Sequence, residues 1–187
     1  MNRSHFIKAI ILATGLLLPT LFAQAETFLT VDQARGIIWG DQQVKPAKVT
    51  LTKDQAKAIR KASKVRVRNL DINAWRTADG GWFILDQVIG KHENIDLAVG
   101  LNADGSVRGI EVLTYRETYG HEVRNPKWRA QFTNWKPGAK TPQGTSPDYL
   151  KLRRDIQNIS GATLSCRHLT DGINRLTHTW ELVLRHL

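Results

Sequence analysis

The sequence predicts an α+β fold, in which an antiparallel β-meander sheet is packed by helices and followed by a long C-terminal helix. Runs of roughly five to nine apolar and β-branched residues, separated by short glycine turns, fill residues 65–114, which is typical of a meander. Apolar residues recur at helical spacing over 169–187. Thr52 and Gln55 form a capping-box pattern, which predicts a helix over 53–63.

The first 25 residues have the pattern of a secretory signal peptide. Arg3 and Lys8 supply the positive charge, and Ala9–Phe22 form an apolar stretch. Ala23-Gln24-Ala25 is a small-x-small cleavage site, so we expect cleavage before Glu26 and export to the periplasm.

The remaining residues, 26–187, suit a single domain with its own core. Within it we expect 26–64 to be a helical N-terminal extension and 65–187 to be the core. The only cysteine, Cys166, excludes an internal disulfide, and burial as a small apolar side chain is its expected role.

The chain carries a net charge of +10, and removal of Arg3 and Lys8 with the leader leaves +8. Such a surface attracts anionic partners. No nucleic-acid-binding motif is present, so nucleic acid is not the expected partner. The histidines lack metal-ligand spacing, and no metal is expected.

Two elements and a loop are expected before the sheet. Apolar spacing predicts a helix over Val31–Trp39, capped by Thr30. Residues 41–48 are polar and contain Pro46, which predicts a loop. The helix over 53–63 follows.

The middle of the chain changes to strand periodicity. We expect four strands, over residues 65–73, 81–89, 92–101 and 106–114. Ala78–Gly81 and Asn102–Gly105 are expected to form tight turns, because Gly105 adopts a positive φ without steric cost.

A short helix, begun by Asn125 and Pro126, is expected after the sheet. Trp128, Phe132 and Trp135 form an aromatic stripe there, for which core packing and a wall beside a planar cofactor are both open interpretations. The glycine- and proline-rich residues 137–147 are expected to form a loop.

The last helix has one continuous apolar stripe. Its members are Leu169, Ile173, Leu176, Trp180, Val183, Leu184 and Leu187. Gly172 interrupts this helix and predicts close contact with the sheet. We expect Ser160, Thr163 or Ser165 at its N-terminus.

The turn over 160–163 runs directly into this last helix. Free N–H groups and the positive end of the helix dipole favour an anion at such a place. The alternative is an ordinary helix start capped by a hydroxyl. Thr163 is suited to carry a phosphoryl group, but its hydroxyl needs a base or a second enzyme to become a nucleophile.

Ser160-Gly161-Ala162-Thr163, followed by Leu164-Ser165, resembles the flavin-attachment motif of the FMN-binding domain family. That family includes subunits of the Rnf and sodium-pumping NADH:quinone reductase complexes and small exported flavoproteins. The resemblance implies that Thr163 carries FMN through a phosphoester bond made by a separate flavin transferase, which uses FAD and magnesium. The residues that it implies around the phosphate are Ser160, Gly161, Ala162, Leu164 and Ser165.

A second segment agrees with this resemblance. The stretch 104–113, followed by Arg116-Glu117-Thr118-Tyr119-Gly120, is similar to the family's strand–turn–strand that leads to Glu-Thr-Pro-Gly. In the family this loop lies beside the flavin ring. The resemblance, which covers about residues 90–187, therefore implies that Glu117, Thr118, Tyr119 and Gly120 line the ring.

Two positions depart from the family pattern. Gln157 stands where the family usually has Asp, three residues before the serine, and Asp155 lies two residues earlier. Tyr119 replaces the usual proline, where an aromatic ring either stacks on the flavin or packs into the sheet. Covalent attachment to Thr163 and non-covalent FMN binding both remain open at this point.

The resemblance implies an exported FMN-binding electron-transfer protein. Flavin accepts electrons in pairs and releases them singly, while the protein supplies binding and electrostatics. We expect an electron carrier or redox subunit that works with a membrane or periplasmic redox partner, rather than a stand-alone catalyst. The alternative is a non-redox exported basic binding module with an inert or non-covalent flavin site.

Overall fold

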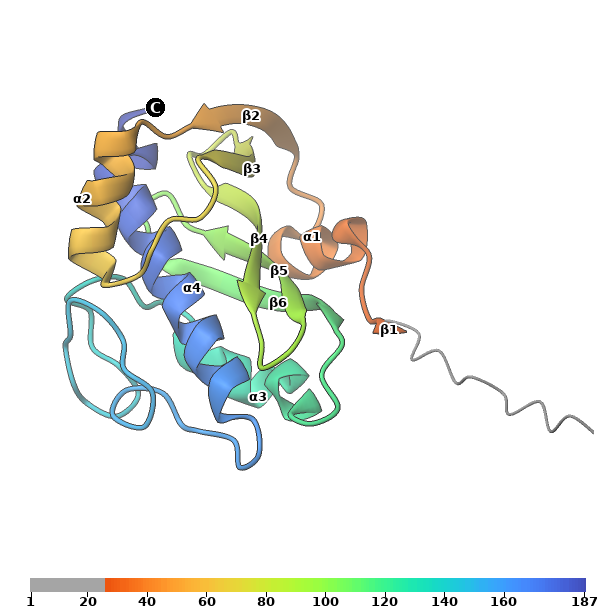
Figure 1. Ribbon diagram of the computed structural model, residues 1–187. Coiled ribbons are helices and arrows are strands. Elements are labelled where there is room, and N and C mark those ends of the chain that lie inside the picture. The colour runs from red at the N-terminus through yellow and green to blue at the C-terminus, as the bar shows by residue number, and fades with distance from the viewer. Residues whose placement is uncertain (1–25) are drawn as a thin grey trace, which may run out of the picture.

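The computed structural model describes residues 26–187, so the predicted signal peptide lies outside the described residues. The strands form one antiparallel six-stranded sheet in the order β1-β6-β5-β4-β3-β2 (Figure 1). The strands are β1 (Glu26–Thr27), β2 (Val44–Thr50), β3 (Asp71–Thr77), β4 (Trp82–Ile89), β5 (Asn94–Leu101) and β6 (Val107–Tyr115). The α-helices are α1 (Val31–Trp39), α2 (Lys53–Ser63), α3 (Pro126–Arg129) and α4 (Thr163–Leu182). Short 3₁₀ turns span His121–Arg124, Ala130–Phe132 and Leu184–His186.

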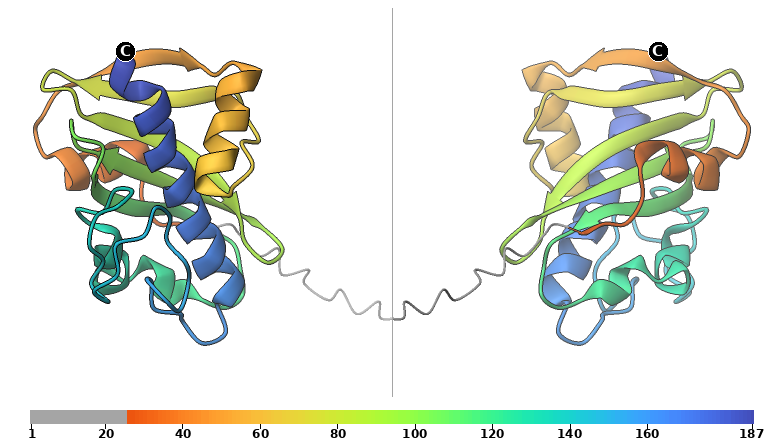
Figure 2. Two further views of the ribbon diagram at one scale, coloured as in Figure 1. Left: turned by 90° about the vertical axis from the view of Figure 1, so that its left-hand side faces the viewer. Right: turned by 90° about the vertical axis from the view of Figure 1, so that its right-hand side faces the viewer.

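The sheet is covered on both faces, so the predicted α+β architecture is confirmed. α4 crosses one face with α2 beside it, and α1 lies on the opposite face (Figure 2). Because alternate strand residues point to opposite faces, each strand contributes to two cores. The core on the α4 side includes Ile84, Leu97, Val99, Val112, Leu169, Ile173 and Leu176. The smaller core on the α1 side includes Ala34, Ile38, Trp39, Phe83, Ala98 and Leu113.

Capping boxes set the starts of α1 and α2. The Thr30 hydroxyl accepts a hydrogen bond from the Gln33 N–H, and the Gln33 side chain accepts one from the Thr30 N–H. Thr52 and Gln55 make the same two bonds at the start of α2. Both helices have their predicted bounds, because each box satisfies two N–H groups that the helix leaves unpaired.

The predicted loop over 41–48 is wrong in its second half, where β2 begins at Val44. β2 is an edge strand of the described sheet, and its neighbour is β3. Its lysines and Pro46 suit an edge strand. Proline has no N–H group to donate to a second neighbour, and lysines at an edge discourage further strand pairing. Together with β1 at the opposite edge, the segment 26–64 therefore contributes strands as well as the two expected helices.

The first predicted strand, over 65–73, begins later than expected. Residues 64–70 have no regular structure, and β3 starts at Asp71. β3 then pairs with β4 only between Asn73–Arg76 and Leu85–Trp82. Beyond Leu85, β4 is therefore unpaired on this side, and the sheet opens above α4.

The other strands and the short helix lie where the sequence predicts them, within a few residues. Trp128, Phe132 and Trp135 are buried in the core, which selects core packing over a cofactor wall. Cys166 is buried as expected.

α4 approaches β4 closely, as Gly172 predicts. A Cβ at Gly172 would lie 2.8 Å from the Val88 Cγ1 atom. Among residues 26–187, no helix is both long and apolar enough to cross a membrane.

Candidate functional site

The start of α4 is open rather than capped. Ala162 occupies the N-cap position, and no side chain accepts a hydrogen bond from the first turn. The first main-chain bond at this end runs from the Cys166 N–H to the Ala162 carbonyl, 2.9 Å. The helix therefore does not start with a hydroxyl cap, which was the alternative interpretation. Its first N–H groups remain available to bind an anion.

The turn before the helix leaves space above it. Gly161 has a φ of +80°, and no other part of the described chain comes within 4 Å of where its Cβ would lie. Ser160 and Gly161 are exposed, while Ala162 is buried. A phosphate could therefore approach the main chain at Gly161 without displacing a side chain.

Thr163 is the first residue of α4, and its hydroxyl is held by Asn158. The Asn158 Nδ2 atom donates to the Thr163 Oγ1 atom over 3.2 Å. The Asn158 Oδ1 atom is buried and has no hydrogen-bond partner among the residues described. An unpaired buried oxygen carries a free-energy cost, which a bound donor such as a ribityl hydroxyl would relieve.

A cavity of about 360 Å³ adjoins Thr163. Four cationic side chains line it: Lys64, Lys151, Arg153 and Arg167. They come from the end of α2, the segment before the turn, and α4 itself. In the sequence, the only sign of this cationic lining is that basic residues cluster at 45–68 and 151–154. Solvated surface is the simpler interpretation of both clusters from the sequence alone.

The two segments that carry the family resemblance lie against each other. A Cβ at Gly120 would lie 2.4 Å from the Ala162 Cβ atom. The Tyr115 hydroxyl is 2.6 Å from the Tyr119 carbonyl, to which it donates, and 3.0 Å from the Ser165 hydroxyl. Burial raises the pKa of Tyr115, so this hydroxyl keeps its proton. The Ser165 side chain is buried, and its hydroxyl shares this hydrogen bond with Tyr115.

Within the loop 117–120, the side chains take different directions. Glu117 is buried, and its Oε1 atom accepts hydrogen bonds from the N–H groups of His92 (2.6 Å) and Glu93 (3.1 Å). Thr118 is exposed, and Tyr119 is 74% exposed, so Tyr119 does not pack into the sheet. The loop therefore fixes the β4–β5 hairpin and presents one free aromatic ring beside the turn.

The position of the usual family acid is exposed here. The Gln157 N–H donates to the Gln131 Oε1 atom, and its own side chain faces solvent. Asp155 is fully buried and accepts from Thr145 Oγ1 and the Lys151 N–H, and it pairs with Arg154. Asp155 therefore holds the preceding loop together and does not replace the missing acid.

Glu117→Gln should destabilise the protein at pH 7 by about 1–3 kcal/mol. Burial would raise the pKa of Glu117, but hydrogen bonds from the His92 and Glu93 N–H groups bring it below its ordinary value. A depressed folded pKa gives stability that is present above the unfolded pKa of about 4.3 and is lost as pH falls through the folded pKa. Urea unfolding at several pH values checks this, and a difference between variant and wild type that stays constant down to pH 3 contradicts it.

Gly120→Ala should separate the loop from the turn. Gly120 (φ +91°) and Gly144 (φ +83°) both have a left-handed backbone conformation. A Cβ at Gly120 would overlap Ala162, whereas a Cβ at Gly144 would lie in open space. Gly144→Ala is therefore the matched control and should lose about 1–2 kcal/mol of unfolding free energy. Gly120→Ala should lose roughly 1–3 kcal/mol more because of the overlap with Ala162. Equal losses in urea unfolding would show that the close approach does not constrain the site.

Residues 90–178 match the model of the FMN-binding domain family. Two curated relatives are subunits of the Na(+)-translocating NADH-quinone reductase, from Vibrio vulnificus strains YJ016 and CMCP6. Each is 34% identical over 96 residues, which cover 46% of this chain and 34% of the relative. The aligned part thus spans about a third of the length of these relatives. Within residues 26–187, no group of three or more His, Cys, Asp or Glu side chains is placed to hold a metal ion.

Proposed function

Since residues 90–178 belong to the FMN-binding domain family, whose cofactor is FMN, we propose that this chain is an exported electron-transfer flavoprotein with FMN joined to Thr163 by a phosphoester bond. One observation carries this proposal. Thr163 begins an uncapped 20-residue helix and faces a cavity that four cationic side chains line.

The residues around Thr163 suit a flavin phosphate in charge and in space. The first-turn N–H groups and the helix dipole favour an anion, and nearby ammonium and guanidinium groups strengthen its hydrogen bonds. Gly161 keeps the approach open. Asn158 orients the Thr163 hydroxyl through its Nδ2 atom, so the oxygen that becomes esterified already has a fixed position.

Attachment requires a flavin transferase with FAD and magnesium. The Thr163 oxygen attacks the FMN phosphorus of FAD, the pyrophosphate bond breaks and AMP leaves. The proton of the threonine hydroxyl passes to a base of the transferase, since among the described residues Thr163 Oγ1 has a hydrogen bond from the Asn158 amide and none to a carboxylate or histidine. Ser160, Gly161, Ala162, Leu164 and Ser165 then surround the phosphodiester, and the loop 117–120 packs behind them.

Bound FMN supplies the chemistry of accepting two electrons and passing them on singly. The chain's own residues hold the cofactor and set its electrostatic surroundings. The two Vibrio relatives are subunits of a sodium-translocating NADH-quinone reductase, which supports a role as carrier or redox subunit rather than as a stand-alone catalyst.

The sequence supports export and a partner of opposite charge. The leader pattern over 1–25 favours delivery to the periplasm, and the +8 charge that remains favours a redox partner with an acidic face. Such a partner would be a membrane or periplasmic protein, with association that weakens as salt rises.

The attachment is tested with the protein exported from cells that also contain a flavin transferase. We expect denatured wild-type protein to carry one FMN on the peptide that contains Thr163, by mass spectrometry and flavin absorbance. Thr163→Val should carry none, while Thr163→Ser, which keeps a hydroxyl, should retain part of the loading. Full covalent flavin on Thr163→Val would overturn the assignment. Absence of flavin in every form of the wild type would favour the non-redox binding module.

Gln157→Asp should increase the fraction of protein that is flavinylated, because it restores the acid usual in the family at an exposed position that a transferase can reach. Gln157→Ala should not increase it. The ratio of flavin to protein absorbance after a fixed expression time measures both variants. An unchanged ratio in Gln157→Asp would show that this position does not limit attachment.

A further inference from the structure

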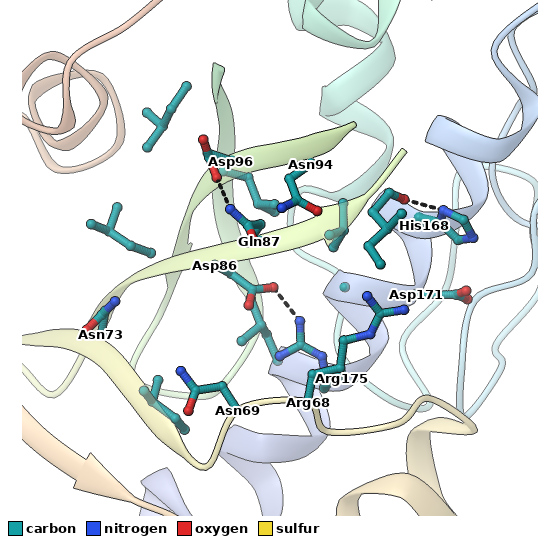
Figure 3. A pocket seen from close by; sticks show the side chains of 18 of the residues that line it. Arg68, Asn69, Asn73, Asp86, Gln87, Asn94, Asp96, His168, Asp171 and Arg175 are labelled. Atoms are coloured by element: carbon teal, nitrogen blue, oxygen red, sulfur yellow. Dashed lines mark hydrogen bonds and ion pairs between the residues drawn. The ribbon is translucent and has the colours of Figure 1, made fainter. Parts of the chain in front are cut away.

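A cavity of about 710 Å³, larger than the one at Thr163, opens where β3 and β4 separate (Figure 3). Apolar residues from both sides of the sheet line this larger cleft. Those of the α1 side are Leu29, Leu85 and Leu113, and those of the α4 side are Val88, Leu97 and Leu176. The larger cleft therefore reaches both faces of the sheet, at the place beside β4 that a further strand would occupy.

The end of β4 forms one wall of the larger cleft and presents main-chain groups to it. The Gly90 N–H donates to the Glu93 carbonyl over 2.7 Å, so Gly90 faces β5. Successive strand residues direct their main-chain groups to opposite sides, so those of Gln87 and Ile89 point away from β5. The Ile89 carbonyl accepts a hydrogen bond from the His168 Nδ1 atom. Because β3 pairs with β4 only as far as Leu85, the other groups have no strand partner within residues 26–187.

The segment 64–70 forms the opposite wall and has the side-chain alternation of a strand. Val65 and Val67 are half-buried, while Arg66 and Arg68 are exposed. This alternation is what predicts a strand here from the sequence. Yet residues 66–69 form no main-chain to main-chain hydrogen bond with any other part of the described chain. The larger cleft thus lies between a strand edge and a strand-like segment, neither of which has a neighbour there.

The charges around the larger cleft favour an acidic occupant. Arg66 and Arg68 are exposed on its wall, and neither forms an ion pair among the described residues. The exposed and half-exposed carboxylates already have partners: Asp86 pairs with Arg175 (2.5 Å), Asp96 accepts from Gln87 Nε2 (2.6 Å) and Asp71 accepts from the Thr50 hydroxyl (2.7 Å). Asp171 is half-buried on α4. The charge that remains available at the rim is therefore mainly positive.

We propose that the larger cleft binds an extended, acidic segment of a partner protein, which pairs with β4 as an added strand. A peptide that joins a free sheet edge gains main-chain hydrogen bonds, while its alternate side chains enter pockets. The N–H groups of Gln87 and Ile89 donate to carbonyls of this segment. Apolar side chains on its inner side meet Val88 and Leu176, and acidic side chains on its exposed side are attracted by the two arginines of the wall.

Docking in the larger cleft brings the partner close to Thr163. Asp171 lines both the larger cleft and the cavity at Thr163, so the two adjoin. The rise along α4 from Thr163 to Asp171 is about 12 Å, at about 1.5 Å per residue. A redox partner held there would lie beside the proposed flavin. That consequence rests on the proposed function, whereas docking does not, so Thr163→Val should bind the segment as wild type does.

The test uses the exported protein and a synthetic peptide of alternating glutamate and valine residues with blocked ends. Binding should slow hydrogen exchange of the Gln87 and Ile89 N–H groups on the order of ten-fold, as measured by NMR. A peptide with lysine in place of glutamate should bind about ten-fold more weakly. A glutamate–valine peptide with N-methylated main-chain amides keeps the side chains and should bind about five-fold more weakly, because it lacks the donors of a strand.

A proline at position 87 tests the same main-chain contact from the protein's side. Gln87→Pro should weaken binding about five-fold, because it removes an N–H group that faces the larger cleft and leaves the pairing with β5 in place. Gln87→Ala is the matched control. It loses the same hydrogen bond to Asp96 but keeps the N–H group, so it should bind as wild type does.

Charge reversal tests the acidic character of the segment. Arg66→Glu combined with Arg68→Glu should weaken binding roughly three- to ten-fold. Arg60→Glu combined with Lys61→Glu makes the same change in net charge on the exposed side of α2, outside the larger cleft, and should change binding little.

Four results would overturn the proposal. Unchanged exchange at Gln87 and Ile89 with millimolar glutamate–valine peptide would show that no strand is added. Equal binding of the N-methylated and unmodified peptides would exclude strand pairing, whatever the fold of Gln87→Pro. Equal binding of the lysine peptide would exclude an acidic partner. Protection of the same N–H groups that rises with protein concentration alone would assign the larger cleft to a second copy of this chain.

Discussion

The contact between the end of β6 and the start of α4 is the constraint on which the candidate site depends. Gly120 and Ala162 approach so closely that no side chain fits between them, and the Tyr115 hydroxyl bonds to both segments. These segments are about 40 residues apart in the chain. Their packing fixes where α4 begins, and therefore where Thr163 and the first N–H groups of the helix are presented.

α4 combines structural and functional roles on different faces. Its apolar side packs on the sheet, and its buried hydroxyls bond to main-chain carbonyls one turn earlier. Asp171, which is half-buried, lines both the cavity at Thr163 and the larger cleft between α4 and the sheet. The cleft exists because β3 leaves β4 after Leu85, so an interruption in the sheet supplies the enclosed space.

The sequence was sufficient where local chemistry determines the structure. The capping boxes give the starts of α1 and α2, and the small-residue motif gives the start of α4. It was insufficient for β2, because an edge strand that is half exposed lacks the apolar alternation of a central strand. It also could not reveal the larger cleft, since the separation of β3 from β4 after Leu85 is a tertiary property.

The most direct test of the central claim is a ³¹P NMR titration of the native, flavin-loaded protein. A phosphodiester between Thr163 and the ribityl chain has no second ionisation near neutrality, so its resonance should stay constant between about pH 5 and pH 8. FMN held without a covalent bond is a monoester, and its second proton dissociates with a pKa of about 6. A resonance that moves through that range would contradict attachment at Thr163.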